Sequence, residues 1–423
     1  MTERYDVLVV GAGPAGLAAA HAAASHGARV GLLDAQARGG GQVWRHDVVA
    51  GDAALARRSI AAAMQHPGVA WLPQTRVVLA ESGGLLVEDP QHAHRLEYGA
   101  LVLATGAREL LLPFPGWTLP GVTGAGGLQA LAKQGWPLAG KRVVIAGSGP
   151  LLFAAAATAH RHGAEVLGIH EQAGRAAVAR FAAGLWRWPA KAAQAVSLRA
   201  RLSGVPYRCG SLVRRASGDE RVQAVEIADG HGSRRLECDL LAVGFGLVPD
   251  TRLAYLLGCE MEQEGAHPRV CVDAEQRTSV AGIYAAGEIC GIGGRDCARV
   301  EGAIAGHAAA GARAAASALL ARKRHAQAFA AHLRTHFALG PDARALAEPD
   351  TVICRCEDVT LHALDGYTDS RGAKLATRCG MGACQGRICG SALAELGRFP
   401  YAGQRPPLFP ARLSTLSDGH RGA

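Results

Sequence analysis

Five of the eleven cysteines of this chain lie close together near the C-terminus. They form a Cys-x-Cys pair followed by three thiols in a glycine-rich stretch, and they are Cys354, Cys356, Cys379, Cys384 and Cys389. Clustered thiolates bind soft metals, and glycine-rich turns let backbone N–H groups approach sulfur and stabilise a negatively charged cluster. Four thiolates also satisfy zinc, so these residues leave an iron–sulfur cluster, a zinc ion and a metal-free structural loop open.

A glycine turn near the N-terminus is the second group of residues that could do chemistry. Residues 5–10 have the pattern of an apolar strand, an alanine-rich helical stretch begins at residue 17, and the turn joins them. In a dinucleotide-binding fold such a turn brings the backbone and the helix N-terminus up to a pyrophosphate. The next strand ends in Asp34, where an acid hydrogen-bonds a ribose hydroxyl. The pattern therefore predicts a dinucleotide site.

Three later segments favour FAD as the dinucleotide. Residues 39–42 resemble the Gly-Gly-Gln turn that lies over the flavin in thioredoxin-reductase-like proteins, and residues 101–106 end in the small-residue turn typical of flavoproteins with two dinucleotide folds. Residues 279–288 resemble the segment whose terminal acid binds the ribityl chain, with glutamate where most such proteins have aspartate. The residues expected at the FAD site are Gly11, Gly13, Pro14, Ala15, Gly16, Asp34, Gly41, Gln42, Thr105, Gly106, Gly287 and Glu288.

A second strand, turn and helix pattern begins at residue 142 and departs from the motif. Gly147 and Gly149 are present, but Leu152 stands where a third glycine lets the helix pack closely on the strand, so it must push them apart or occupy a cavity. Glu171 ends the following strand, where it could hold a ribose, and its charge disfavours the 2′-phosphate of NADP. Two interpretations stay open: a nucleotide site built on these residues, and a fold relic that only supports an interface. No Cys-x-x-Cys occurs in the chain, so disulfide exchange of the thioredoxin-reductase type lacks its residues.

These motifs, together with the segments 105–121, 243–249 and 287–294, resemble the alpha subunits of heteromeric flavin-dependent amino-acid dehydrogenases. This group contains opine oxidases, D-hydroxyproline dehydrogenases, hydrogen cyanide synthase and archaeal-type proline dehydrogenases. The cysteine segment resembles the module related to bacterioferritin-associated ferredoxin, although its last pair is spaced Cys-x-x-x-x-Cys and the smallest such ferredoxins have Cys-x-x-Cys. The resemblance implies a 2Fe-2S cluster with Cys379 as a spare thiol and with the ligands Cys354, Cys356, Cys384 and Cys389.

The family resemblance also implies a division of labour between subunits. A beta subunit resembling D-amino-acid oxidase binds the substrate and its own FAD, while this chain holds FAD and the cluster and passes electrons on. A small ferredoxin-like gamma subunit is common, and some relatives have FMN between alpha and beta or ATP in the second nucleotide fold. The implied function is the electron-transfer subunit of a dye- or quinone-linked dehydrogenase acting on CH–NH donors. The D-hydroxyproline or opine type is favoured, the hydrogen cyanide synthase type is included, and no catalytic residue is assigned to this chain.

Two other functions remain as alternatives. A free-standing NAD(P)H-dependent reductase of a ferredoxin-like carrier would have the same FAD site, and fast bleaching of its FAD by NADH would reveal it. A scaffold that holds a catalytic partner with inert cofactors would show no rapid reduction of its centres by substrate in the full complex.

Composition narrows the partners and the location. Lys and Arg total 45 against 36 Asp and Glu, and the resulting charge of +9 is scattered along the chain, so we expect no nucleic-acid partner. The N-terminus has no basic segment leading into a cleavable signal, and the longest apolar stretches are about half of the roughly 20 residues that span a bilayer. We expect a cytoplasmic protein without a transmembrane segment, with peripheral contact to the inner face of the membrane left open.

We therefore predict an α/β fold of the type found in flavoproteins with two dinucleotide-binding domains, similar to thioredoxin and glutathione reductases, plus a small helical 2Fe-2S module. Because the FAD motifs lie far apart in the sequence, the FAD domain must be discontinuous. The predicted boundaries are 1–138 and 252–320 for the FAD domain, 139–251 for the inserted NAD-like domain, 321–346 for a helical connector, 347–395 for the 2Fe-2S module and 396–423 for an extended tail.

Overall fold

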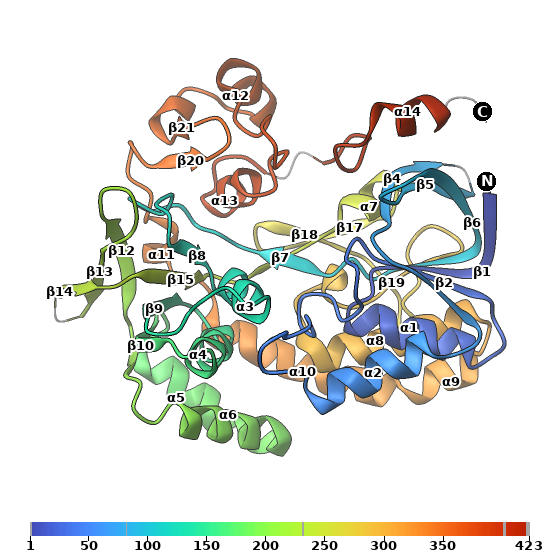
Figure 1. Cartoon of the computed structure of the whole chain (residues 1–423), viewed down its shortest axis with the longest axis horizontal. Coiled ribbons are helices and arrows are strands. Elements are labelled where there is room, and N and C mark those ends of the chain that lie inside the picture. Colours follow the sequence, from blue (N-terminus) through green and yellow to red (C-terminus); the bar gives the residue numbers. More distant parts are fainter. Residues whose placement is uncertain (1, 82, 231, 401–402, 420–423) are drawn as a thin grey trace.

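Two mainly parallel β-sheets organise the chain into two α/β units (Figure 1). The computed structural model describes residues 2–81, 83–230, 232–400 and 403–419. In each unit one parallel strand of the sheet runs into one of the two glycine turns, because an apolar strand, a turn and an alanine-rich helix follow one another directly in the sequence.

The first unit is built on a seven-stranded sheet with the strand order β3-β2-β1-β6-β5-β4, to which β19 is added beside β6. Strands β1, β2, β3, β6 and β19 pair in parallel, whereas β4, β5 and β6 form an antiparallel meander. Since β19 comes from much later in the chain, two separate stretches form this unit. Its strands are β1 (Thr2–Val10), β2 (Val30–Leu33), β3 (Val69–Leu72), β4 (Arg76–Glu81), β5 (Gly84–Glu88), β6 (Ala93–Leu103) and β19 (Ile283–Ala285).

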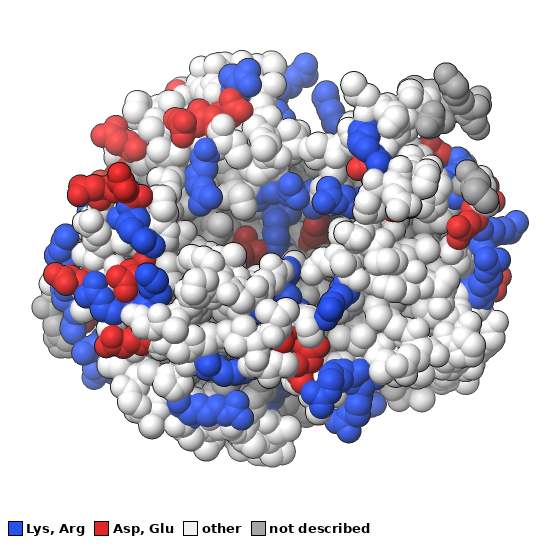
Figure 2. All heavy atoms as spheres, in the orientation of Figure 1, with Lys and Arg blue, Asp and Glu red and all other residues white. Residues whose placement is uncertain are grey.

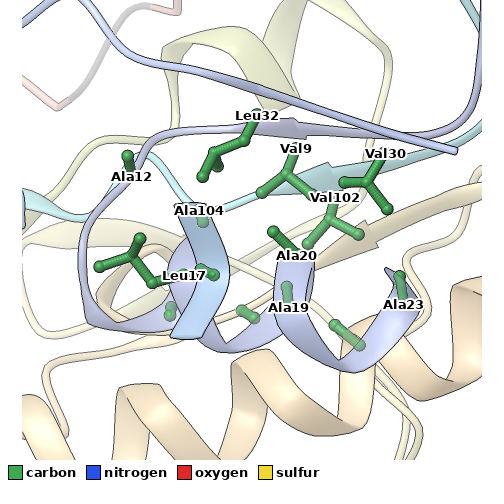
Figure 3. Close-up of a cluster of buried hydrophobic side chains, with 14 of the residues drawn as sticks. Val9, Ala12, Leu17, Ala19, Ala20, Ala23, Val30, Leu32, Val102 and Ala104 are labelled. Carbon is green, nitrogen blue, oxygen red and sulfur yellow. The ribbon is translucent and has the colours of Figure 1, made fainter. Parts of the chain in front are cut away.

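Small side chains let two helices pack closely under this sheet. Helix α1 (Pro14–Ala24) lies against α8 (Gly294–Ala309), and side chains at Gly302 and Gly306 would overlap backbone atoms of α1. The alanines of α1 meet the valines and leucines of the sheet in one buried cluster (Figure 3). Close helix contact through alanine and glycine therefore replaces packing through large rings. Helix α2 (Ala54–Met64) packs alongside α1.

The second unit has a parallel sheet of five strands in the order β11-β10-β9-β15-β8 and a three-stranded antiparallel sheet, β12-β13-β14. Strand β8 pairs with β15 in this sheet, and the following helix α3 packs on α4, so residues 122–133 belong here and the predicted boundary at residue 139 lies inside the unit. The strands are β8 (Val122–Gly124), β9 (Arg142–Gly147), β10 (Glu165–Glu171), β11 (Tyr207–Cys209), β12 (Leu212–Ser217), β13 (Ala224–Asp229), β14 (Gly232–Glu237) and β15 (Leu240–Gly244). The helices are α3 (Ala125–Lys133), α4 (Leu151–Arg161), α5 (Arg175–Gly184), η1 (Leu185–Arg187) and α6 (Pro189–Arg201).

Two antiparallel strands carry the chain between the units. Strand β7 (Ala107–Glu109) leaves the first unit and β16 (Leu247–Pro249) returns to it, and the two pair with each other. The chain then completes the first unit through α7 (Arg252–Leu256), β17 (Met261–Glu264), β18 (His267–Val270), η2 (Glu288–Cys290) and α9 (Arg313–Ala318).

A helical connector leads to the cysteine module. Helix α10 (Leu320–Phe337) contacts both α8 and α5, and the short α11 (Pro341–Arg344) follows it. The module lies above the two units in Figure 1 and consists of β20 (Val352–Cys354), β21 (Val359–Thr360), η3 (His362–Leu364), α12 (Ser370–Thr377) and α13 (Cys389–Glu395).

The tail returns to the first unit and lies along β4, β5 and β6. The backbone N–H of Leu408 donates to the carbonyl of Val78, and Arg412 donates to the carbonyl of Asp89 over 2.7 Å. The prediction of an extended tail is wrong for the end of the tail, where residues form helix α14 (Leu413–Gly419). The local sequence pattern does not favour a helix there, and contacts with β6 supply the packing that stabilises it. Within the described part of the chain, no helix combines the length and apolar character needed to cross a bilayer.

Candidate functional site

The first glycine turn lies between β1 and α1 at the edge of the first sheet. A side chain at Gly16 would overlap the carbonyl oxygen of Gly11, and a side chain at Gly11 would overlap the carbonyl oxygen of Ala104 at the end of β6. Only glycine lets the turn, the helix and the neighbouring strand approach this closely. Gly13 has no heavy atom within 4 Å of the position that a Cβ would take, so its side of the turn is open.

A cavity of about 290 Å³ opens on that side of the turn. It is lined by most of the residues predicted for the FAD site, namely Gly11, Gly13, Pro14, Ala15, Asp34, Gly41, Gln42, Thr105, Gly106 and Glu288. The other two predicted residues, Gly16 and Gly287, are buried behind the wall, where a Cβ on Gly287 would come within 2.9 Å of the Cβ of Ala15. Segments far apart in the sequence therefore meet at one cavity.

The two predicted acids differ in how their carboxylates are held. Asp34 accepts hydrogen bonds from the backbone N–H groups of Ala12 (2.7 Å) and Gln36 (2.9 Å), so the acid is tied to the glycine turn. Burial raises the pKa of the Asp34 carboxyl, and these hydrogen bonds oppose the rise. Burial also raises the pKa of Glu288, against a hydrogen bond from the backbone of Gly294.

Sequence reasoning missed the charged part of the cavity wall, which contains Arg108, Asp250, Arg252, Arg295 and Arg387. Arg108 and Arg387 stand inside motifs used above, so the sequence contained a signal, but no spacing shows where their side chains point. Basic side chains gather around the hollowed centre of the face in Figure 2, and elsewhere on that face both signs are interspersed. No stripe of one sign runs across this face.

Asp250 links the charged wall to the predicted flavin turn. Its carboxylate accepts two hydrogen bonds from Arg252, of 2.7 and 2.6 Å, and its carbonyl accepts one from the Thr105 hydroxyl at 2.7 Å. Burial acts to raise the pKa of Asp250, but the hydrogen bonds and the charge of Arg252 outweigh burial and lower it. Asp250 is therefore ionised and paired at neutral pH.

At the second glycine turn, Leu152 packs against a glycine of the neighbouring strand. Leu152 is fully buried, and its Cδ2 lies 3.1 Å from the position that a Cβ on Gly244 would take. The matching pair in the first unit is Gly16 beside Ala104. Sequence analysis predicted that Leu152 either pushes helix and strand apart or occupies a cavity. Leu152 occupies a space, and that space exists because Gly244 has no side chain.

Glu171 is turned inward at the second turn. It is 1 % exposed, and its carboxylate accepts hydrogen bonds from the backbone N–H groups of Gly149 (2.7 Å) and Ala173 (2.9 Å). Burial raises the pKa of Glu171 to about 7, against those hydrogen bonds. The Glu171 carboxylate, which sequence analysis proposed as a ribose ligand, is thus buried and hydrogen-bonded to the backbone of neighbouring segments.

The cysteine module brings thiols together differently from the predicted ligand set. The Sγ atoms of Cys354, Cys379 and Cys389 all lie within 4.8 Å of one another, and the three residues are buried. Cys356 and Cys384 interact with each other through their thiols. The structure therefore places the supposed spare Cys379 beside two of the predicted ligands.

Backbone N–H groups of the glycine-rich turns point at these sulfurs. Burial acts to raise the pKa of Cys384, but hydrogen bonds led by the backbone N–H of Ile388 outweigh it and lower the pKa. Burial raises the pKa of Cys354, against hydrogen bonds that begin with the backbone N–H of Gly380. Thiols with N–H donors around them suit a negatively charged metal–thiolate cluster.

The module also forms part of the cavity wall. Arg387, which lies between Cys384 and Cys389, lines the cavity, and its carbonyl accepts a hydrogen bond of 3.1 Å from Arg108. Arg108 also donates to the Ser391 hydroxyl over 2.7 Å. The segment that carries Cys384 and Cys389 therefore also supplies a residue of the cavity wall.

Comparison with known proteins agrees with this arrangement. Residues 5–314 match the family model described as pyridine nucleotide-disulphide oxidoreductase. Hydrogen cyanide synthase subunit HcnB of Pseudomonas aeruginosa is 35 % identical over an alignment that covers 90 % of this chain and 90 % of that protein. The A subunit of opine oxidase from Rhizobium meliloti is 34 % identical over an alignment that covers 98 % of this chain and 98 % of that protein.

Solved structures show the same fold. L-proline dehydrogenase from P. horikoshii superposes with a TM-score of 0.65 at 20 % identity, over 98 % of this chain and 80 % of that chain. Thioredoxin reductase from T. acidophilum superposes with a TM-score of 0.55 at 22 % identity, over 75 % of this chain and 98 % of that chain. The predicted fold class is confirmed, and the family model implies FAD binding. The chain belongs to the pyridine nucleotide-disulphide oxidoreductase family, in the group that contains hydrogen cyanide synthase subunit HcnB and the opine oxidase A subunits.

Proposed function

We propose that this chain is the FAD- and 2Fe-2S-containing electron-transfer (alpha) subunit of a heteromeric dehydrogenase. The partner subunit oxidises an amino acid, an imino acid or an opine at a carbon–nitrogen bond. The observation that carries the proposal is that Arg387, which stands between Cys384 and Cys389 in the sequence, also lines the cavity of the glycine turn. Two redox groups held there would be close neighbours.

The chain's own residues fit FAD. The open side of Gly13 and the N-terminus of α1 would face the pyrophosphate, Asp34 would hold a ribose, and Glu288 would hold the ribityl chain. The guanidinium groups of the charged wall would favour the phosphates by charge-assisted hydrogen bonding. When bound, FAD accepts an electron pair and a 2Fe-2S cluster accepts one electron at a time, so the two groups together would divide a two-electron oxidation into single transfers.

The cysteine module fits a 2Fe-2S cluster. We assign the ligands by resemblance to Cys354, Cys356, Cys384 and Cys389, while the position of Cys379 makes it a competitor for one place. Replacing Cys354 or Cys384 by Ser should abolish the electron paramagnetic signal of the reduced cluster. The matched Cys379→Ser variant should keep it. Retention of full iron and sulfide in Cys384→Ser would instead give Cys379 the ligand role.

The substrate site and its flavin belong to the partner in this proposal. The hydrogen cyanide synthase and opine oxidase relatives are both named as subunits, which supports a multi-subunit enzyme. We propose three features to look for: a D-amino-acid-oxidase-like beta subunit, a further ferredoxin-like gamma subunit, and FMN between alpha and beta. D-hydroxyproline and opines are the favoured substrates, followed by the hydrogen cyanide synthase type. A cytoplasmic location, with or without peripheral membrane contact, stays a prediction.

One experiment tests the proposal. The chain is purified with its co-expressed partners and mixed without oxygen with D-hydroxyproline, opines or a panel of other amino acids. Flavin and cluster absorbance are followed, with a dye as acceptor. We expect one substrate class to reduce both centres in the complex, and neither centre in the isolated chain. Fast reduction of the isolated chain by NADH would favour the reductase of a ferredoxin-like carrier. Oxidation of an amino acid by the isolated chain would overturn the proposal.

A further inference from the structure

The second glycine turn is covered by a segment of the same chain. Helix α10 ends at Phe337, and the next residues run in extended form over the turn before α11 begins. The Ser148 hydroxyl donates to the carbonyl of Phe337 over 2.8 Å. The Gln172 amide donates to the carbonyl of Ala338 over 2.8 Å and accepts from the backbone N–H of Gly340 over 3.1 Å. Residues 337–340 are thus hydrogen-bonded to both sides of the turn.

These contacts lie at the two places where such a fold holds a nucleotide. In a dinucleotide-binding fold, the turn faces a pyrophosphate and the end of the second strand faces a ribose. Here the N–H of Gly149 donates to Glu171, and a Cβ on Gly149 would lie 3.7 Å from the Cβ of Phe337. Phe337 covers the turn and Glu171 is enclosed, so neither the turn nor the acid is left for a nucleotide. The adenine nucleotide suggested by resemblance does not fit this site.

Aromatic packing supports the segment from below. The ring of Phe337 meets that of Phe181 on α5 edge to face, with 4.9 Å between the ring centroids. His332 of α10 stacks on Phe181 (5.0 Å) and on Trp188 (5.4 Å). Helix α10 is therefore seated on the second unit along its last turns, and the hydrogen bonds at its end continue that contact.

The covered turn is connected to the cysteine module by a short path. Arg344 of α11 donates to Glu395 over 2.9 Å, and Glu395 lies on α13, the helix that begins at Cys389. A carboxylate oxygen of Glu395 also lies 3.0 Å from Nε2 of His267 on β18 in the first unit. The segment thus anchors the connector just before it reaches the module.

We propose that the second dinucleotide fold is a docking seat for residues 337–340, which excludes adenine nucleotides and fixes the cysteine module against the glycine-turn cavity. Ser148 and Gln172 are positioning residues in this arrangement. The proposal depends only on the contacts described here, and it holds whether or not the chain transfers electrons in a dehydrogenase.

The first arm of the test measures the seat in the full-length chain with its flavin bound. Hydrogen–deuterium exchange of the amides in 338–346 is compared between the wild type, the double variant Ser148→Ala/Gln172→Ala and the control Gln263→Ala, which changes an exposed residue of β17. Because the double variant removes the three side-chain hydrogen bonds to residues 337–340, we expect exchange in 338–346 to be about tenfold faster or more, with the control unchanged. Unchanged exchange in the double variant would overturn the proposal.

The second arm uses the unaltered chain, so it does not depend on the variants folding. Equilibrium dialysis of the flavin-loaded chain against ATP or ADP at about 1 mM should show that neither nucleotide binds. One bound ATP per chain, with faster exchange in residues 337–340, would show that the turn is a nucleotide site and would overturn the proposal. Neither arm uses substrate turnover, so its failure is distinct from failure of the proposed electron-transfer role.

Discussion

The two glycine turns of this chain have the same backbone plan and opposite surroundings. Each joins a strand to an alanine-rich helix, and in each an acid from the next strand accepts a hydrogen bond from the turn, Asp34 from Ala12 and Glu171 from Gly149. The first turn opens into a cavity, whereas the second is covered by residues 337–340. The turn motif therefore specifies a fold, and only the elements that lie over it decide whether a ligand has access.

The close packing behind each turn is solved by a different pair of residues. In the first unit Gly16 faces Ala104, and in the second Leu152 faces Gly244, so the larger residue of the pair stands at the strand end in the first unit and on the helix in the second. Leu152 has three more side-chain carbons than Ala104, so the second unit holds a larger side chain at this place, and the missing Cβ of Gly244 leaves part of the room for it. Loss of the third glycine therefore does not disrupt the second unit.

The largest effect is expected from Gly16→Leu, which gives the first turn the leucine that the second turn has at position 152. A side chain at Gly16 would overlap the carbonyl of Gly11, and Ala104 leaves no matching space, so Gly16→Leu should prevent folding of the first unit and abolish flavin binding. Flavin absorbance of the purified chain and circular dichroism measure this. A Gly16→Leu chain with full flavin content would show that the two turns are interchangeable and would break the comparison.

A smaller effect is expected from removing most of the Leu152 side chain behind the second turn. Leu152→Ala should lower the free energy of unfolding by about 2 to 5 kcal/mol, the usual cost of removing a buried leucine side chain. Gly244→Ala should also destabilise, because its Cβ would lie 3.1 Å from Leu152 Cδ2. In the double variant the added methyl fills part of the space, so chemical denaturation should show a combined loss smaller than the sum. Strict additivity would mean that the two residues are not coupled.

The two acids should differ in their effect on flavin binding. Asp34→Asn removes a charged hydrogen-bond acceptor at the cavity, worth about 1.5 to 3 kcal/mol, and should weaken FAD binding about 10- to 100-fold. The matched Glu171→Gln variant should keep its FAD, since Glu171 is enclosed at the other turn. Fluorescence titration of the deflavinated chain with FAD gives both affinities. Equal losses would contradict the assignment of different roles.

The smallest effect is a pH dependence. Burial raises the pKa of Glu171 to about 7 in the folded chain, above the ordinary value that the unfolded chain keeps, so the folded state binds more protons and stability falls as pH rises through this window. From about pH 6 to about pH 8 the loss should be about 1 kcal/mol. Denaturation at both pH values should show a weaker dependence in Glu171→Gln than in the wild type. An identical pH dependence of stability in the variant and the wild type would show that Glu171 is not its source.

Local patterns allowed much of this molecule to be predicted. The strand, turn and helix around Gly11 are contiguous, and the hydrophobic pattern with a glycine turn is enough to specify them, because backbone sterics act over a few residues. The same holds for Asp34, whose place at the end of the next strand follows from the chain order. The sequence also identified the cysteine stretch, since five thiols in one segment are visible without a structure.

Contacts between distant parts of the chain could not be read in this way. Ser148 and Phe337 are 189 positions apart, and no local pattern shows that an extended segment will lie over the second turn. The position of Cys379 among the thiols and of Arg387 in the cavity wall depends on how the module docks. Local sterics and periodicity act along the chain and are written in it, whereas docking depends on the summed burial of surfaces that only the folded units present to each other.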